Sequence, residues 1–244
     1  MEDTKLGRGV TVLHITLYQG DLLQQHPWVT SKSVKAATAY VTNGNISTEK
    51  GVNLPTGWTL GPSPPPPVDI TKLPKGEDAN WEEWIPFLRP SIQSLQNVDL
   101  YLPRAGHPLI ATHDVWARLA NGDRWFQDDL GFVLDIGPPL LVESFRPPKG
   151  EDTTAQGGYA HNTSMWYPTI AASLETKKRL PAEGTEWIRY RVVCKSIKNG
   201  RFDAEVLIFD LEGDLVALSH HVALALGSER NLKSKLKSKA EGKL

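Results

Sequence analysis

The alternation of apolar and polar positions is clearest in the last third of the chain, over residues 186–226. Three runs alternate with a period of two, and short polar turns separate them. The first turn, Lys198-Asn199-Gly200, supplies residues that tolerate positive φ, and Glu212-Gly213-Asp214 is a comparable three-residue loop. The pattern predicts three antiparallel strands. The middle strand carries apolar residues on both faces, so we expect it to be covered on both.

Two further strands are predicted near the start of the chain, over residues 10–23 and 33–47, which are rich in apolar and β-branched residues. Residues 51–90 differ in character, because they hold nine prolines and should form no regular ladder. Three tryptophans, Trp58, Trp81 and Trp84, lie near them, and so much aromatic area is rare in a disordered linker. We therefore expect this stretch to cross over between two related halves along a surface.

One amphipathic helix is predicted, over residues 127–145, where apolar residues recur at helical spacing. Asp128 or Asp129 is suited to cap its start, and Gly137-Pro138-Pro139 should break or kink it. The second half therefore contains, in order, strands over 94–103 and 113–125, the helix, one more strand and the meander of 186–226.

This order of elements predicts an α+β hot-dog fold, in which an antiparallel sheet wraps around one central helix. Residues 115–226 would form the hot-dog. The chain then divides into partial hot-dog strands (1–50), a Pro/Trp-rich crossover (51–95), a C-terminal hot-dog with its central helix (96–228) and a Lys-rich tail (229–244).

Composition excludes several classes of protein. A net charge of −1 argues against nucleic acid as a partner. The lone Cys194 reads as a small buried hydrophobe and indicates a reducing compartment. Without an apolar run of membrane-spanning length or an N-terminal signal, we expect a soluble, cytoplasmic protein. The last residues, Gly242-Lys243-Leu244, resemble the S-K-L peroxisomal address, so the peroxisome is the alternative.

Several segments together resemble the double hot-dog acyl-CoA thioesterases, the thioesterase II family, and in particular its fungal thioesterase-like branch. In the second half these segments are VWARLANGD, DDLGFVLDIGPPLL, WYPTIAASLETKKRLPAEGTEW and GRFDAEVLIFDLEGDLVALSHHVALAL. In the first half they are KLGRGVTVLHITLYQ, AYVTNGNISTEKGVNLPTGW and SLQNVDLYLPRAG. Relatives carry an opening strand, a helix and another strand ahead of the position of Lys5. The resemblance therefore implies that the first hot-dog is incomplete here.

The resemblance also implies a site. In the family an Asp on the helix of the second module, a Thr or Ser on the following strand and a Gln on the last strand hold the attacking water. These positions match Asp135, Thr169 and His221, which we predict to be catalytic. The Asp that usually follows the hydroxyl by two places is Ala171 here. As substrate-binding residues we predict Ser173, which is also an alternative hydroxyl, His220 and Trp166.

Residue chemistry leaves more than one function open. A carboxylate, a hydroxyl and an imidazole within reach of one another could activate water for thioester hydrolysis. If Asp135 were buried, its pKa should rise toward the working range of a general base. An imidazole at 221 titrates near neutral pH, so an Asp/His pair would also suit a cyclase, dehydratase or isomerase of secondary metabolism. A non-catalytic lipid-binding or interaction module is the third reading.

Each candidate residue also has a purely structural interpretation. Asp135 could point to solvent, Thr169 could cap its own strand, and His220 and His221 could bond backbone carbonyls. The remaining histidines show no metal-ligand spacing, so we predict neither metal nor cofactor. The expected partner is a small acyl or polyketide thioester. A partial first sheet would also expose an apolar face, which either the crossover or a homodimer partner would cover.

Overall fold

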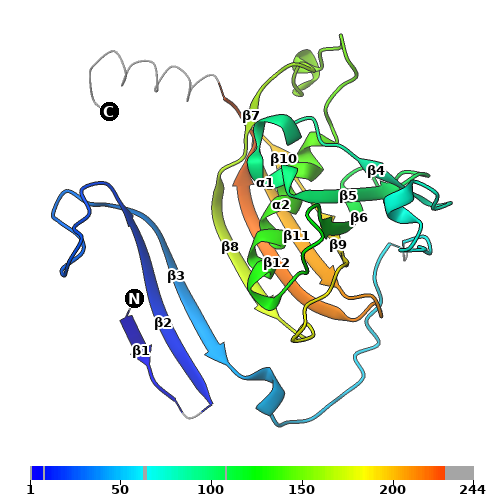
Figure 1. Ribbon diagram of the computed structural model, residues 1–244. Coiled ribbons are helices and arrows are strands. Elements are labelled where there is room, and N and C mark those ends of the chain that lie inside the picture. Colours follow the sequence, from blue (N-terminus) through cyan, green and yellow to red (C-terminus); the bar gives the residue numbers. More distant parts are fainter. Residues whose placement is uncertain (1, 8, 63–64, 108, 229–244) are drawn as a thin grey trace. The chain divides into compact units, whose positions relative to one another are not determined.

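A computed structural model describes residues 2–7, 9–62, 65–107 and 109–228 of the chain (Figure 1). The chain divides into two compact units, Met1–Gly57 and Trp58–Leu244, and each is described by itself. The Lys-rich tail and its terminal Gly242-Lys243-Leu244 lie outside the described residues.

The first unit contains a three-stranded antiparallel sheet in the order β1-β2-β3. Its described part contains no α-helix, in agreement with the partial sheet that we predicted. Leu17 on β2 and Tyr40 on β3 are 62% and 75% exposed, so large apolar side chains lie in solvent on this unit. The elements are β1 (Glu2–Lys5), β2 (Val10–Gln19), β3 (Val34–Gly44) and a 3₁₀ turn (Ile46–Thr48).

The second unit is built on an eight-stranded antiparallel sheet within the described residues. The strands run in the order β4-β5-β6-β9-β11-β12-β8, and β10 also pairs with β11. They are β4 (Trp81–Trp84), β5 (Val98–Pro103), β6 (Thr112–Leu119), β8 (Thr169–Thr176), β9 (Ile188–Val193), β10 (Ile197–Lys198), β11 (Arg201–Phe209) and β12 (Leu215–Leu224). Smaller elements are the pair β7 (Met165–Trp166) and β13 (Leu226–Gly227), helix α1 (Gln93–Gln96) and 3₁₀ turns at Leu73–Lys75, Arg89–Ser91, Gln127–Asp129 and Thr154–Gln156.

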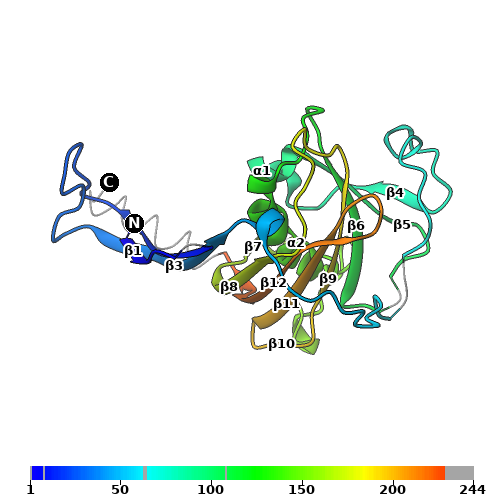
Figure 2. The same cartoon turned by 90° about the horizontal axis from the view of Figure 1, so that it is seen from below.

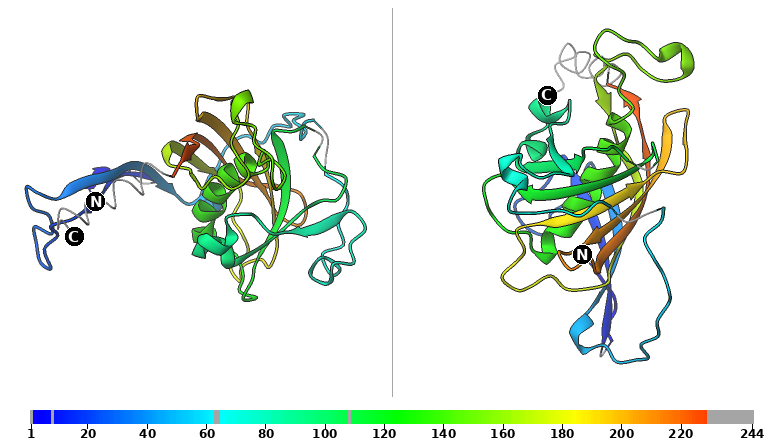
Figure 3. Two further views of the ribbon diagram at one scale, coloured as in Figure 1. Left: turned by 90° about the horizontal axis from the view of Figure 1, so that it is seen from above. Right: turned by 90° about the vertical axis from the view of Figure 1, so that its right-hand side faces the viewer.

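Helix α2 (Leu130–Glu143) lies across the sheet and contacts β9, β11 and β12 (Figures 1 and 2). Figure 3 shows from two more directions that the strands curl around it. The core between helix and sheet is almost solvent-free, since Val133, Leu141 and Ile208 are all 0% exposed. The second unit is therefore the hot-dog that the order of elements predicted. Among the described residues, no helix has the length and apolar content needed to cross a membrane.

The central helix corrects the predicted break at Gly137-Pro138-Pro139, because the helix is continuous through these residues. The two prolines lack the N–H groups that would bond the carbonyls of Leu134 and Asp135, yet the helix continues to Glu143. Its last turns are held by packing, since the residues after the prolines are buried in the core. The predicted cap takes a different form: the Asp129 carboxylate accepts a hydrogen bond from the backbone N–H of Phe126 at 2.8 Å.

The Pro/Trp-rich stretch corrects a second prediction, because part of it joins the sheet. Trp81–Trp84 forms β4 and pairs antiparallel with β5, so the stretch does contain a regular ladder. Trp81 is 0% exposed and packs with Tyr101, Trp116 and Trp187 in a small second core. Since this core includes residues of β5 and β6, the crossover lies along the sheet of the second unit, whereas Trp58 is 56% exposed.

The predicted meander is confirmed. Strands β9, β11 and β12 are neighbours in the sheet, and the first turn places Asn199 and Gly200 at φ 53° and 78°. The middle strand, β11, is covered on both faces, because the adjacent residues Ile208 and Phe209 are 0% and 2% exposed. The guanidinium carbon of Arg189 lies 4.1 Å from the centroid of the Phe209 ring. These two side chains lie on one face of the sheet, and Tyr190 lies on the other.

Candidate functional site

Asp135 and Thr169 meet where the central helix passes the start of β8. The Thr169 hydroxyl donates a hydrogen bond to Asp135 Oδ1 at 3.2 Å, although the two residues are far apart in sequence. Both side chains are exposed. Asp135 is therefore not buried. Instead, the carboxylate is open to solvent and oriented by a hydroxyl group.

A bulge in β8 directs Thr169 toward the helix. Ala171 pairs with Val222, but the next residue of β12, Ala223, pairs with Thr169, so Ile170 is an extra residue on β8. Side chains alternate along a regular strand, and without the bulge Thr169 would share a face with Ala171. The extra residue moves Thr169 to the face of Ala223, which belongs to the core around α2.

His221 lies on that same inner face of β12, two positions from Ala223, and is only 5% exposed. One ring nitrogen, Nε2, is 2.9 Å from the hydroxyl of Ser219. The other, Nδ1, is buried and has no hydrogen-bond partner among the described residues. If the Ser219 hydroxyl donates to Nε2, then Nδ1 carries the proton and is a free donor.

The charge state of His221 follows from its surroundings. Burial lowers the pKa of the imidazole below its usual value; the Asp135 carboxylate acts in the opposite direction, and His220 adds to the lowering. The net effect favours the neutral ring at neutral pH. Because Asp135 influences His221 electrostatically and bonds Thr169 directly, the structure brings the three predicted catalytic residues to one region of the hot-dog.

Two of the three predicted substrate-binding residues lie on the other face of the sheet. Ser173 and His220 are directly opposite each other in the β8–β12 ladder, on the face of the sheet that His221 does not share. Trp166 belongs to β7, where it pairs with Leu226 and is 44% exposed. Within the described part of the chain, no hydrogen bond links them to Asp135 or Thr169. Their contact with substrate stays a prediction.

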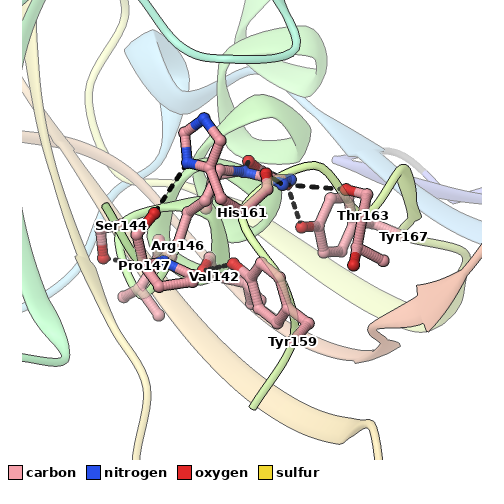
Figure 4. A network of polar contacts seen from close by, with 10 residues as sticks. Val142, Ser144, Arg146, Pro147, Tyr159, His161, Thr163 and Tyr167 are labelled. Carbon is pink, nitrogen blue, oxygen red and sulfur yellow. Dashed lines mark hydrogen bonds and ion pairs between the residues drawn. The ribbon is translucent and has the colours of Figure 1, made fainter. Parts of the chain in front are cut away.

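A polar network at the end of α2 was not anticipated from the sequence (Figure 4). Arg146 binds the Glu143 carboxylate through two nitrogens, each at 2.7 Å, and the two side chains are 6% and 1% exposed. Its Nη1 also donates to the carbonyls of His161 and Thr163, at 2.6 and 2.8 Å. The hydroxyl of Tyr167 donates to Glu143 Oε1. This network ties the loop that leads into β8 to the helix.

Few signals in the sequence could have revealed these supporting residues. Ser219 stands two places before His221 on a strand, so the period of two places both on one face. Glu143 and Arg146 are three positions apart at the end of α2, but nothing local indicates that Tyr159 and Tyr167 join them. Among the described residues, no group of three or more His, Cys, Asp or Glu side chains could hold a metal ion.

Comparison with known proteins decides the family. The sequence model of the acyl-CoA thioesterase C-terminal domain matches residues 67–225, which is more than half of the chain and includes Asp135, Thr169 and His221. The chain belongs to this family. As a member of the acyl-CoA thioesterase C-terminal domain family, it is 37% identical over 255 residues to the thioesterase-like protein TwmA of Talaromyces wortmannii, covering 95% of this chain and 72% of TwmA.

Solved structures agree with the hot-dog fold of this acyl-CoA thioesterase family member. A hot-dog protein of unknown function from Alicyclobacillus acidocaldarius superimposes with a TM-score of 0.56 at 15% identity, covering 93% of this chain and 71% of that one. A protein from Thermobifida fusca, provisionally assigned as a thioesterase II, gives a TM-score of 0.54 at 19% identity, with coverage of 92% and 70%. At these identities the similarity concerns the fold alone.

Proposed function

We propose that this chain is a thioesterase-like hot-dog enzyme that hydrolyses an acyl-CoA or polyketide-type thioester. The observation that carries the proposal is the hydrogen bond from Thr169 to Asp135, beside a neutral His221 with one free ring nitrogen. A carboxylate, a hydroxyl and an imidazole are the groups that water activation requires. Membership of the acyl-CoA thioesterase family supports a thioester as the substrate class.

In this proposal each residue has one role. Asp135 takes a proton from water as the water oxygen bonds to the thioester carbonyl carbon, and Thr169 holds the carboxylate in place. Neutral His221 holds the same water, and the proton that Asp135 received passes to the leaving sulfur. Collapse of the tetrahedral intermediate breaks the C–S bond. The products are a carboxylic acid and a free thiol.

The direct experiment is a screen of purified protein against acyl-CoA thioesters of several chain lengths. Free thiol release would be followed with a thiol reagent, and the acids would be identified by mass spectrometry. Release of thiol together with the matching acid supports hydrolysis. A product that retains the acyl chain in cyclised or dehydrated form would support the second candidate function.

The second candidate function is a non-hydrolytic hot-dog enzyme of secondary metabolism, acting as a cyclase, dehydratase or isomerase. The observation that favours it is His221 itself, because the resemblance places a glutamine there in hydrolytic relatives. A buried neutral imidazole next to a carboxylate can give and take protons, which an amide cannot do. A non-catalytic lipid-binding module is the outcome if neither reaction is found.

Replacing His221 with glutamine should separate the two enzymatic functions. A hydrolase should retain or gain activity, because glutamine is the residue that the resemblance implies for hydrolysis. An acid/base cyclase or dehydratase should lose roughly a hundredfold in kcat along with its proton donor. The measurement is kcat for the product found in the screen. His26→Gln, an exposed change in the first unit, is the matched control and should leave kcat within about twofold.

We also propose a homodimer and a cytoplasmic location. Exposed apolar residues on β2 and β3 support the dimer, because soluble monomers rarely expose large apolar faces. Light scattering on the purified chain is expected to give twice the monomer mass. A strictly monomeric mass at micromolar concentration would contradict the dimer.

A further inference from the structure

We propose that Tyr167 is a positioning residue: its hydroxyl, fixed by Glu143, holds the segment before β8 so that the bulge presents Thr169 to Asp135. This inference rests on the proposed function, since it concerns the same pair of residues. It adds a part of the molecule that lies outside the catalytic trio.

The β8–β12 ladder alone does not determine where the Thr169 hydroxyl lies. Regular pairing ends at Ala171, and the extra residue Ile170 interrupts the ladder before Thr169 is reached. A bulged residue leaves its strand locally unpaired and free to bend. On the far side of the bulge, the N–H of Leu224 donates to the carbonyl of Pro168 at 3.0 Å, and Met165–Trp166 pairs with Leu226–Gly227. These bonds hold the segment to neighbouring strands, and none of them holds it to α2.

Tyr167 attaches the segment to α2. It stands two residues before Thr169 and donates its hydroxyl to Glu143 Oε1. The Tyr167 hydroxyl stays a donor at any working pH, because burial and the Glu143 carboxylate both raise its pKa. Asp135 and Glu143 are eight positions apart on α2, about 12 Å along the axis. The start of β8 is thus attached to the helix at two separated points.

The acceptor on the helix is itself rigid. Glu143 is held by the bidentate pair with Arg146, and its side chain is almost fully buried. Arg146 is fixed in turn by two loop carbonyls (Figure 4), and its guanidinium carbon lies 4.1 Å from the centroid of the Phe87 ring. A buried, doubly bonded ion pair has few alternative geometries. The bond to Tyr167 is therefore made to a fixed point.

The test compares Tyr167→Phe with Tyr159→Phe. Both changes delete one half-buried hydroxyl from the network, but Tyr159 bonds the carbonyl of Val142 at 2.9 Å and lies earlier in the loop. We expect Tyr167→Phe to lower kcat by roughly ten- to a hundredfold at nearly constant KM, because a small displacement of a catalytic group has such effects. Tyr159→Phe should leave kcat within about twofold while lowering thermal stability to a similar extent.

A double-mutant cycle adds a readout that a purely structural role would not move. If Tyr167 acts through Thr169, then adding Tyr167→Phe to Thr169→Val should lower kcat no further than Thr169→Val alone. Multiplicative effects, or equal losses in the two tyrosine variants, would overturn the inference. Full activity of Thr169→Val would instead count against the proposed function.

A crystal structure of Tyr167→Phe decides the matter even where turnover is not found. We expect the Thr169 Oγ1 to Asp135 Oδ1 distance, 3.2 Å in the native chain, to exceed hydrogen-bonding range. If the distance is unchanged, Tyr167 does not position Thr169.

Discussion

Replacing Asp135 with asparagine is expected to abolish thioester hydrolysis, with a loss of at least about a hundredfold in kcat. Asparagine has nearly the same shape and can still accept the hydrogen bond from Thr169, so the local geometry should persist. It cannot take the proton that water must give up. The measurement is the initial rate of thiol release from the best substrate of the acyl-CoA screen, for wild type and variant side by side.

The matched control for this experiment is Asp128→Asn. Asp128 is an exposed carboxylate on the turn before α2, so its change has the same chemistry at a place outside the helix. It should leave both kcat and the melting temperature nearly unchanged. Because Asp135 is exposed, its own variant should also fold normally. Unchanged turnover in Asp135→Asn would remove the proposed site and move the binding-module interpretation to first place.

Replacing Arg191 with methionine is expected to destabilise the second unit by about 3–5 kcal/mol. Arg191 and Asp114 are 0% and 1% exposed, and they form a bidentate pair with distances of 2.9 and 2.6 Å. Arg191 also donates to the carbonyl of Gly61 at 2.5 Å, which anchors the crossover. Without the guanidinium, Asp114 is a buried charge without its partner. Urea unfolding followed by tryptophan fluorescence measures the loss.

The comparison for Arg191→Met is Lys195→Met, which removes the exposed cation of the Lys195–Glu205 pair at 3.4 Å. Exposed ion pairs are worth little, so this change should cost less than about 1 kcal/mol. Arg189 is the other cation near Asp114, but its Nη1 is 3.5 Å away and forms no hydrogen bond within the described residues. Equal losses in the two variants would show that the buried pair contributes no more than a surface pair.

The candidate site was only partly accessible to sequence reasoning. Asp135, Thr169 and His221 were chosen by resemblance, and the structure brings them to one region. Asp135 is exposed, which is one of the two settings that the sequence left open, since a helix pattern indicates which face is apolar but not how far neighbouring elements cover it. Ser173 and His220 were grouped with the site although alternation along a strand separates them from His221.

Elements with strong local signals were determined by the sequence itself. The meander of residues 186–226 depends on a period of two and on Asn199-Gly200, whose positive φ values the turn requires. The central helix follows from a run of apolar residues at helical spacing. These signals act between neighbours a few positions apart, so they can be read without knowledge of the fold.

Only the tertiary structure decided the features that join distant segments. The helix passes through Pro138 and Pro139 because packing of the following turn in the core outweighs two missing hydrogen bonds. Trp81–Trp84 becomes a strand because β5 offers it an edge. Thr169 faces Asp135 because a bulge opposite β12 reverses the alternation. Each of these depends on a partner far away in sequence, and no local pattern records which partner the folded chain provides.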